Sequence, residues 1–283
     1  MNVWSKLSPP PFAPLEEGEH HYILVDGAQV DRLSCRLAAY RPPLADQPLF
    51  GETLAPETSD VTPHLLTLVD VGIFRSLMFA WADKLYSHGA LTWLVSPLPP
   101  AELARRLRAR LDARLPERFD CVNRFFDGRV TPHLHHCLTT TQRDVFFSPC
   151  TQWWVVAANH AWLRLPCRLA REEAFRPPLE FDQAQQAYLI EACYPYAVIQ
   201  HFLQSDAELL ATIAEPEQYA FFRDALRAAA RFGIDGGATA VLFCTLALTR
   251  GATFYEELAW RAALANVQRS EMTLQQAVKA HHD

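Results

Sequence analysis

The stretch YILVDGAQ, Tyr22 to Gln29, is an apolar run that closes on aspartate and glycine. A counterpart further along the chain, FDCVNRFFDGRV from Phe119 to Val130, also ends in Asp-Gly. Each segment predicts a buried strand whose C-terminal end opens into a loop or helix, and in open α/β sheets that edge usually carries the functional residues. The two segments therefore predict a sheet and a candidate site beside Asp26 and Asp127.

The composition is typical of a folded globular protein. The chain has 283 residues, 50% hydrophobic and 11% aromatic, which is enough for one large core or two modest ones. A nucleic-acid partner would need a strongly basic face, and the formal net charge of -6 argues against one. The 7 cysteines, which include no Cys-x-x-Cys pair, fit buried thiols in a reducing cytoplasm.

The sequence also bears on membranes and targeting. The first residues contain no apolar core of the kind that a secretory signal needs. The longest apolar stretch, Ala238 to Leu248, is too short to span a bilayer. We therefore expect a cytoplasmic protein without a membrane partner.

Apolar runs alternate with helical stripes over residues 1–166, which predicts an α/β lobe with a parallel or mixed sheet and flanking helices. Residues 74–85 show helical spacing, and a leucine every fourth residue predicts a helix from Ala101 to Leu115. Residues 152–157 and 161–165 predict a hairpin. The arginines on the other faces of the leucine-striped helix are expected to be solvated: Arg105, Arg106, Arg108, Arg110 and Arg114.

The pattern changes after Leu165. A charged segment that ends in Pro177-Pro178 predicts a linker, and no convincing strand follows Phe181. We therefore predict an all-helical lobe over residues 179–283. Pro195 should kink or split the first helix of this lobe, and the glycine-rich stretch Gly233 to Thr239 is interpreted as a turn between helices.

Four charged residues form the best candidate site: Asp26, Arg124, Asp127 and Arg129. Two carboxylates at neighbouring strand ends could hold Mg²⁺ or act as nucleophile and acid, with the arginines clamping a phosphate. The other interpretation is an internal ion-pair network that fixes the turns or supports partner binding. Nothing else in the sequence completes a metal or phosphate site, so this second interpretation is favoured and no metal or cofactor is expected.

A second group is rich in metal-capable side chains: His133, His135, His136 and Cys137. His133 and His136 could share a ligand on a helix, but zinc needs two further ligands, and no Cys or His pair offers the usual spacing. The favoured interpretation is a partly exposed helix rich in histidine.

Seven short segments follow one another along the chain: YILVDGAQ at Tyr22, PLFGET at Pro48, TPHLLTLV at Thr62, HGALTWLVS at His88, LARRLRARL at Leu103, VNRFFDGRVT at Val122 and TQWWVV at Thr151. Their order resembles the type VI secretion adaptor or effector-chaperone proteins, which carry the domain of unknown function 4123. The resemblance covers about Tyr22 to Val156 and departs from the family at one point, where the family's Asp-Pro-Arg is Asp127-Gly128-Arg129.

This resemblance implies a protein that is not an enzyme and uses no cofactor. Members bind a specific toxic effector and help load it onto the VgrG spike protein in the cytoplasm of a Gram-negative bacterium. Because the resemblance is loose in the helical lobe, we expect that lobe to supply much of the partner specificity. Two alternatives stay open: a metal- or phosphate-dependent hydrolase that uses Asp26 and Asp127, and a scaffold that touches only the spike.

Overall fold

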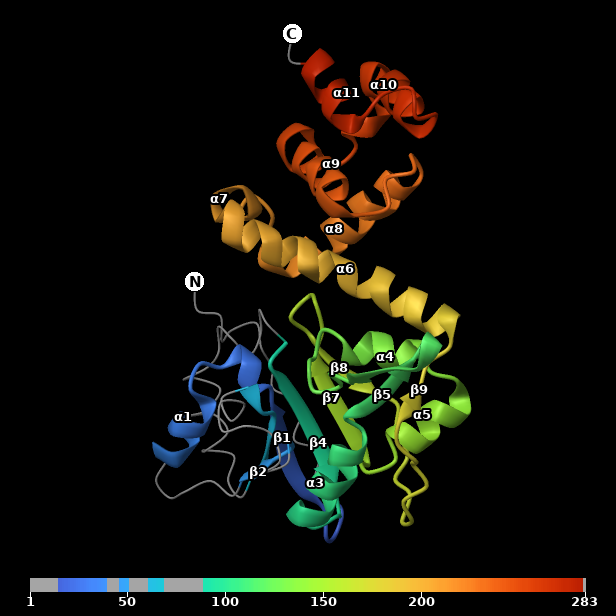
Figure 1. Ribbon diagram of the computed structural model, residues 1–283. Coiled ribbons are helices and arrows are strands. Elements are labelled where there is room, and N and C mark those ends of the chain that lie inside the picture. Colours follow the sequence, from blue (N-terminus) through green and yellow to red (C-terminus); the bar gives the residue numbers. More distant parts are fainter. Residues whose placement is uncertain (1–14, 40–45, 51–60, 69–88, 282–283) are drawn as a thin grey trace. The chain divides into compact units, whose positions relative to one another are not determined.

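The computed structural model describes residues 15–39, 46–50, 61–68 and 89–281 (Figure 1). The helical spacing at residues 74–85 lies outside these described residues. The chain divides into two compact units, residues 1–190 and 191–283. This division falls within a helix, and the lobe boundaries at residues 166 and 179 stay a prediction.

The main sheet of the N-terminal unit has six strands in the order β2-β3-β1-β4-β7-β8, and every neighbouring pair is antiparallel. The α/β class is confirmed, but the predicted parallel or mixed arrangement is wrong for this sheet. The strands are β1 (His20–Val25), β2 (Asp46–Pro48), β3 (His64–Leu68), β4 (Leu91–Ser96), β7 (Gln152–Val156) and β8 (Trp162–Leu165).

Burial on both faces explains why the strand direction was misjudged. All six residues of β4 are buried, and continuous apolar runs of this kind are usual in parallel sheets. Here two separate apolar clusters cover the two faces of an antiparallel sheet. One face packs against Leu103 and Leu107 of α3 (Pro100–Ala109), and the other packs against Leu33 and Leu37 of α1 (Leu33–Ala39).

A smaller sheet of three strands has the order β6-β5-β9, with β5 (Asp112–Leu115), β6 (Phe119–Val122) and β9 (Leu179–Glu180). The strands β5 and β6 are antiparallel, whereas β5 and β9 are parallel. The prediction of a buried strand from Phe119 is wrong, because β6 lies at the edge of this smaller sheet and is mostly exposed. The helix predicted from Ala101 to Leu115 ends early, because its last four residues form β5. The leucine spacing hid a second pattern, because Leu111, Ala113 and Leu115 also alternate with a period of two and turn toward the core.

The remaining elements of the N-terminal unit are helical. After β6 come α4 (Thr131–Cys137) and α5 (Thr140–Phe146), and Thr139 and Gln142 form a capping box at the start of α5. The predicted hairpin at residues 152–165 is confirmed by the antiparallel pairing of β7 with β8.

Beyond β9 the chain is helical in its described residues. Leu179 and Glu180, which were predicted to belong to the all-helical lobe, form a strand that pairs with β5. The first helix continues through Pro195 rather than splitting there. The helices are α6 (Gln183–Ser205), α7 (Ala207–Leu210), α8 (Glu215–Ala230), α9 (Gly237–Arg250), α10 (Leu258–Gln268) and α11 (Leu274–Ala280), with a short turn η5 (Phe254–Glu256). Across the residues described, no helix combines the length and apolar character needed to cross a bilayer.

One buried cation ties three parts of the N-terminal unit together. The Arg110 side chain is fully buried, and its guanidinium donates to the carbonyl oxygens of Phe146 at 2.6 Å, Arg106 at 2.7 Å and Val145 at 3.0 Å. It also makes a two-pronged ion pair with Glu173, at 3.0 and 3.1 Å. The expectation of a solvated arginine is therefore wrong for Arg110 and also for Arg106, which is buried.

This ion pair sets the protonation of Glu173. Burial alone would raise the pKa of Glu173, but the hydrogen bonds and charge of Arg110, together with the Phe175 N–H and the charge of Arg106, outweigh it, and the net pKa is lowered. The carboxylate therefore stabilises the fold above its ordinary pKa, and this contribution is lost as the pH falls through the folded value.

We predict that Arg110→Lys lowers the free energy of unfolding by about 3 kcal/mol or more, because a lysine cannot reproduce the fork and leaves buried carbonyl groups unpaired. Arg105→Lys is the matched control, since Arg105 is exposed and its pair with Glu102 should be worth about 1 kcal/mol or less. Urea denaturation of both variants measures the difference. Equal losses would show that the buried guanidinium is not a structural centre.

Candidate functional site

Asp26 caps the turn that directly follows β1. Its backbone N–H donates to the Ala90 carbonyl at 2.9 Å, which holds the end of β1 against the start of β4. Its side chain is fully buried, and Oδ1 accepts from the Ala28 N–H at 3.0 Å at the start of η2 (Gly27–Gln29). The Asp-Gly sequence thus forms a local turn in which the aspartate side chain accepts a hydrogen bond from the backbone N–H two residues further along the chain.

Asp127 organises the turn between β6 and α4 in the same way. Its Oδ1 accepts from the Arg129 backbone N–H and from Arg129 Nε, both at 2.9 Å. Its Oδ2 accepts from Arg129 Nη2 at 2.7 Å. The Asp127 carbonyl also accepts from the Thr131 hydroxyl at 2.8 Å in the first turn of α4. One carboxylate therefore fixes both the turn and the direction of the next helix.

Arg124 joins the two turns. Its Nη2 lies 2.6 Å from Asp26 Oδ2 and 3.8 Å from Asp127 Oδ2. Its side chain is 41% exposed, and its Cζ lies 5.2 Å from the centroid of the Phe126 ring. The four charged residues singled out in the sequence are thus brought together, although Asp26 and Arg124 are far apart along the chain.

Two glycines let the turns approach one another closely. Gly89 has a φ of +62°, and a Cβ atom there would lie 2.8 Å from Arg129 Cγ and 2.9 Å from Arg129 N. The Gly89 carbonyl accepts from the Gly128 N–H at 2.7 Å. A proline at position 128, as in the resembling family, has no N–H to make this bond. Gly89 was not predicted as a site residue, because a lone glycine gives no signal in the sequence for the backbone that it will approach.

Burial governs the charge of Asp26. Desolvation raises the pKa of this carboxyl, the positive charge of Arg124 opposes the rise, and the negative charge of Asp127 adds to it, so the net pKa lies above its ordinary value. Because the folded chain then binds the proton more tightly than the unfolded chain, the contribution of Asp26 to stability falls as the pH rises from the ordinary pKa through the folded value.

The bonding pattern favours a structural network over a metal or phosphate site. The oxygens of Asp127 are engaged by Arg129, and those of Asp26 are engaged by Ala28 and Arg124. Among the described residues, no group of three histidine, cysteine or acidic side chains is placed to hold a metal ion. Nucleophilic or metal chemistry at Asp127 would first have to break bonds that define the turn.

The histidine-rich segment forms α4, and its side chains have separate surroundings. His135 is buried, its Nε2 lies 2.8 Å from the Pro166 carbonyl, and its ring packs against Phe147. The rings of His133 and His136 both contact Tyr188. Desolvation lowers the pKa of His133, and the charge of His136 adds to the effect. The predicted helix is confirmed, and one of its histidines serves packing in the core.

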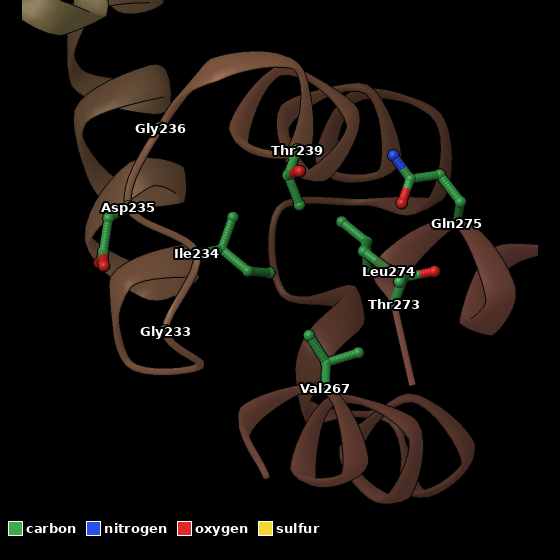
Figure 2. Close-up of a pocket in the computed structure, with 9 residues that line it drawn as sticks. All are labelled: Gly233, Ile234, Asp235, Gly236, Thr239, Val267, Thr273, Leu274 and Gln275. Atoms are coloured by element: carbon green, nitrogen blue, oxygen red, sulfur yellow. The ribbon is translucent and has the colours of Figure 1, made fainter. Parts of the chain in front are cut away.

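The C-terminal unit contains an open hollow of about 390 Å³ between α8, α9, α10 and α11 (Figure 2). The predicted turn between helices is confirmed here, because Gly233 to Gly236 connect α8 to α9. Figure 2 shows Ile234, Val267 and Leu274 turned toward the centre of the hollow, with Asp235 at its margin. The lining of the hollow thus combines apolar side chains with polar ones.

Residues 21–145 match the model of a protein family described as a domain of unknown function (DUF4123). The match spans fewer than half of the 283 residues and includes the turns that carry Asp26 and Asp127. No curated protein and no solved structure matches the chain. The resemblance drawn from the sequence is thus confirmed at the level of this domain, whose description assigns neither an activity nor a partner.

We predict that Asp127→Asn lowers the free energy of unfolding by about 1 to 3 kcal/mol, because the negative charge that pairs with Arg129 is lost and the amide NH₂ cannot accept a hydrogen bond from the guanidinium. Asp26→Asn should cost less, since burial already disfavours the ionised form of this carboxyl. It should also flatten the dependence of stability on pH just above the ordinary pKa of an aspartate.

Urea denaturation at a series of pH values between about 3.5 and 7 checks both expectations, because this series covers the ordinary pKa of an aspartate, about 4. An Asp127→Asn variant of unchanged stability that lost a phosphatase or nuclease activity present in the parent would contradict the structural interpretation of this network.

A second prediction concerns Gly89. We expect Gly89→Ala to destabilise the fold by about 2 kcal/mol or more, because it combines strain at positive φ with a collision against Arg129. Gly18→Ala is the matched control, since Gly18 also has a positive φ of +84° but nothing lies within 4 Å of its added Cβ. Thermal melting of the two variants separates collision from strain. Equal melting temperatures would show that the close contact between Gly89 and Arg129 does not limit the size of the side chain at position 89.

Proposed function

We propose that this protein is a type VI secretion adaptor or chaperone that binds one specific toxic effector and helps to load it onto the VgrG spike. The observation that carries the proposal is the ordered series of seven segments resembling such adaptors, most of which fall inside the family match at residues 21–145. The family's description is silent on function, so the secretion assignment rests on the resemblance.

The polar network around Asp26 and Asp127 supports a structural role in a binding surface rather than catalysis at these residues. The carboxylates of Asp26 and Asp127 are committed to arginines and backbone N–H groups within the fold. Such a network fixes the turns at the ends of the strands without leaving a poised acid or base. A rigid turn of this kind keeps a binding surface in one conformation, which lowers the entropy cost of binding a partner.

Each unit also presents large apolar side chains to solvent. In the N-terminal unit, Phe119 and Val122 of the edge strand β6 are 66% and 56% exposed. In the C-terminal unit, Leu258 at the start of α10 is 86% exposed. Burying apolar side chains against a partner is a main source of binding free energy. We therefore expect the effector and the spike to contact these exposed positions.

The test is co-expression of the chain with the toxin encoded beside its own gene and, separately, with the spike protein. We expect a complex with the effector that survives size-exclusion chromatography. A well-folded chain that forms no complex with either protein would overturn the adaptor proposal.

Two point variants then locate the interface. Following the expectation that the helical part carries specificity, Leu258→Asp should weaken effector affinity about tenfold or more. Val122→Asp in the N-terminal unit is the matched control and should have a smaller effect, while neither variant should change the melting temperature because both side chains are exposed. Calorimetric titration measures both affinities. The opposite ranking would move effector specificity to the N-terminal unit.

A further inference from the structure

A second cluster of chemical groups lies in the main sheet, on the face that α1 covers. In the pairing of β3 with β2, His64 is opposite Pro48 and Leu66 is opposite Asp46. Because side chains alternate with a period of two, His64 and Asp46 emerge on the same face of the sheet. Leu33 of α1 packs on that face, in the same cluster as Leu66, and places the adjoining Ser34 above it.

The three side chains form a continuous line. His64 Nδ1 lies 2.8 Å from Asp46 Oδ2, and His64 Nε2 lies 3.4 Å from Ser34 Oγ. The imidazole is buried, whereas Ser34 is only partly buried and Asp46 is about one-third exposed. Both ends of the line are therefore partly reached by solvent, and the histidine is shielded between its two partners.

The chemistry of the groups assigns the proton positions. An ionised carboxylate can only accept hydrogen bonds, so the short contact with Asp46 places a proton on Nδ1, and the tautomer of the ring that acts as a base carries its single proton there. Nε2 is then the acceptor and faces the Ser34 hydroxyl. This is the arrangement in which a histidine can remove a proton from a serine, and such contacts are often long before a substrate binds.

We propose that Ser34, His64 and Asp46 form a nucleophile, base and positioning carboxylate able to cleave small carboxylic esters at the surface of the N-terminal unit. Ser34 Oγ attacks the ester carbonyl carbon while its proton passes to His64 Nε2. The bond to the leaving oxygen breaks, and that oxygen takes the proton and departs as an alcohol. Water then repeats the sequence on the acyl-serine, which releases the carboxylic acid and restores Ser34.

Small esters are the substrate class because the hydroxyl is reached from the surface. Asp46 does not touch the substrate; it holds the tautomer and orientation of His64. The proposal is independent of the adaptor function, since it uses none of the residues Asp26, Arg124, Asp127 or Arg129, and its readout is covalent chemistry rather than partner binding.

The experiment treats the full chain with a fluorophosphonate, on whose phosphorus a serine displaces fluoride, and locates the adduct by peptide mass spectrometry. We expect the adduct on Ser34 and its loss in Ser34→Ala. Asp46→Asn should slow labelling about a hundredfold or more and change its dependence on pH, because the tautomer is no longer held. Hydrolysis of p-nitrophenyl acetate by the same variants should follow the labelling rates.

Ser205→Ala is the matched control, because the Ser205 hydroxyl donates to a backbone carbonyl, that of His201. It should label at the parental rate. A folded parent chain that acquires no adduct on Ser34 would overturn the proposal and leave the cluster as a structural tie between α1, β2 and β3. Labelling of Ser34 at an unchanged rate in Asp46→Asn would overturn it as well.

Discussion

The buried guanidinium of Arg110 holds together several separate segments of the N-terminal unit. Desolvating this cation is expensive, and it is stable there because Glu173, a serine hydroxyl and three carbonyl oxygens surround it and an aromatic ring lies 4.7 Å from its Cζ. The same residue's carbonyl accepts from the Asn123 side chain at 3.2 Å, one residue before Arg124. Hydrogen bonds therefore connect the chain segment that carries the Asp26–Arg124–Asp127–Arg129 network to the buried Arg110.

That network and the Ser34–His64–Asp46 line illustrate two ways of using buried polar groups. In the first, charged groups neutralise one another and the oxygens are occupied, so the arrangement fixes backbone turns. In the second, an imidazole lies between a carboxylate and a hydroxyl, which is the arrangement from which we propose proton transfer. The difference lies in protonation and access rather than in residue type, which is why acidic residues at strand ends alone did not identify the chemistry.

Much of this organisation could be predicted from the sequence, and the exceptions have physical causes. The strand at Tyr22, the hairpin at residues 152–165 and the turn at Gly233 follow from local patterns. Strand direction did not, because β4 is buried on both faces and loses the alternation that marks an antiparallel strand. The early end of α3 was hidden by leucines that fit two periods, and the burial of Arg110 depends on Glu173, which is distant in sequence. Asp26 and Asp127 were found because each caps its own turn, whereas Ser34, His64 and Asp46 share no local signature.

The contact between Gly89 and Gly128 links two positions that lie far apart in the chain. While Gly128 donates its N–H to the Gly89 carbonyl, that carbonyl is satisfied and the Arg129 backbone stays close to Gly89. A lineage with proline at position 128 gives up this donor, so its residue 89 carbonyl must find another partner or turn toward water. Substitutions at the two positions should therefore be non-additive, and the order in which a lineage acquired them decides which intermediates could fold.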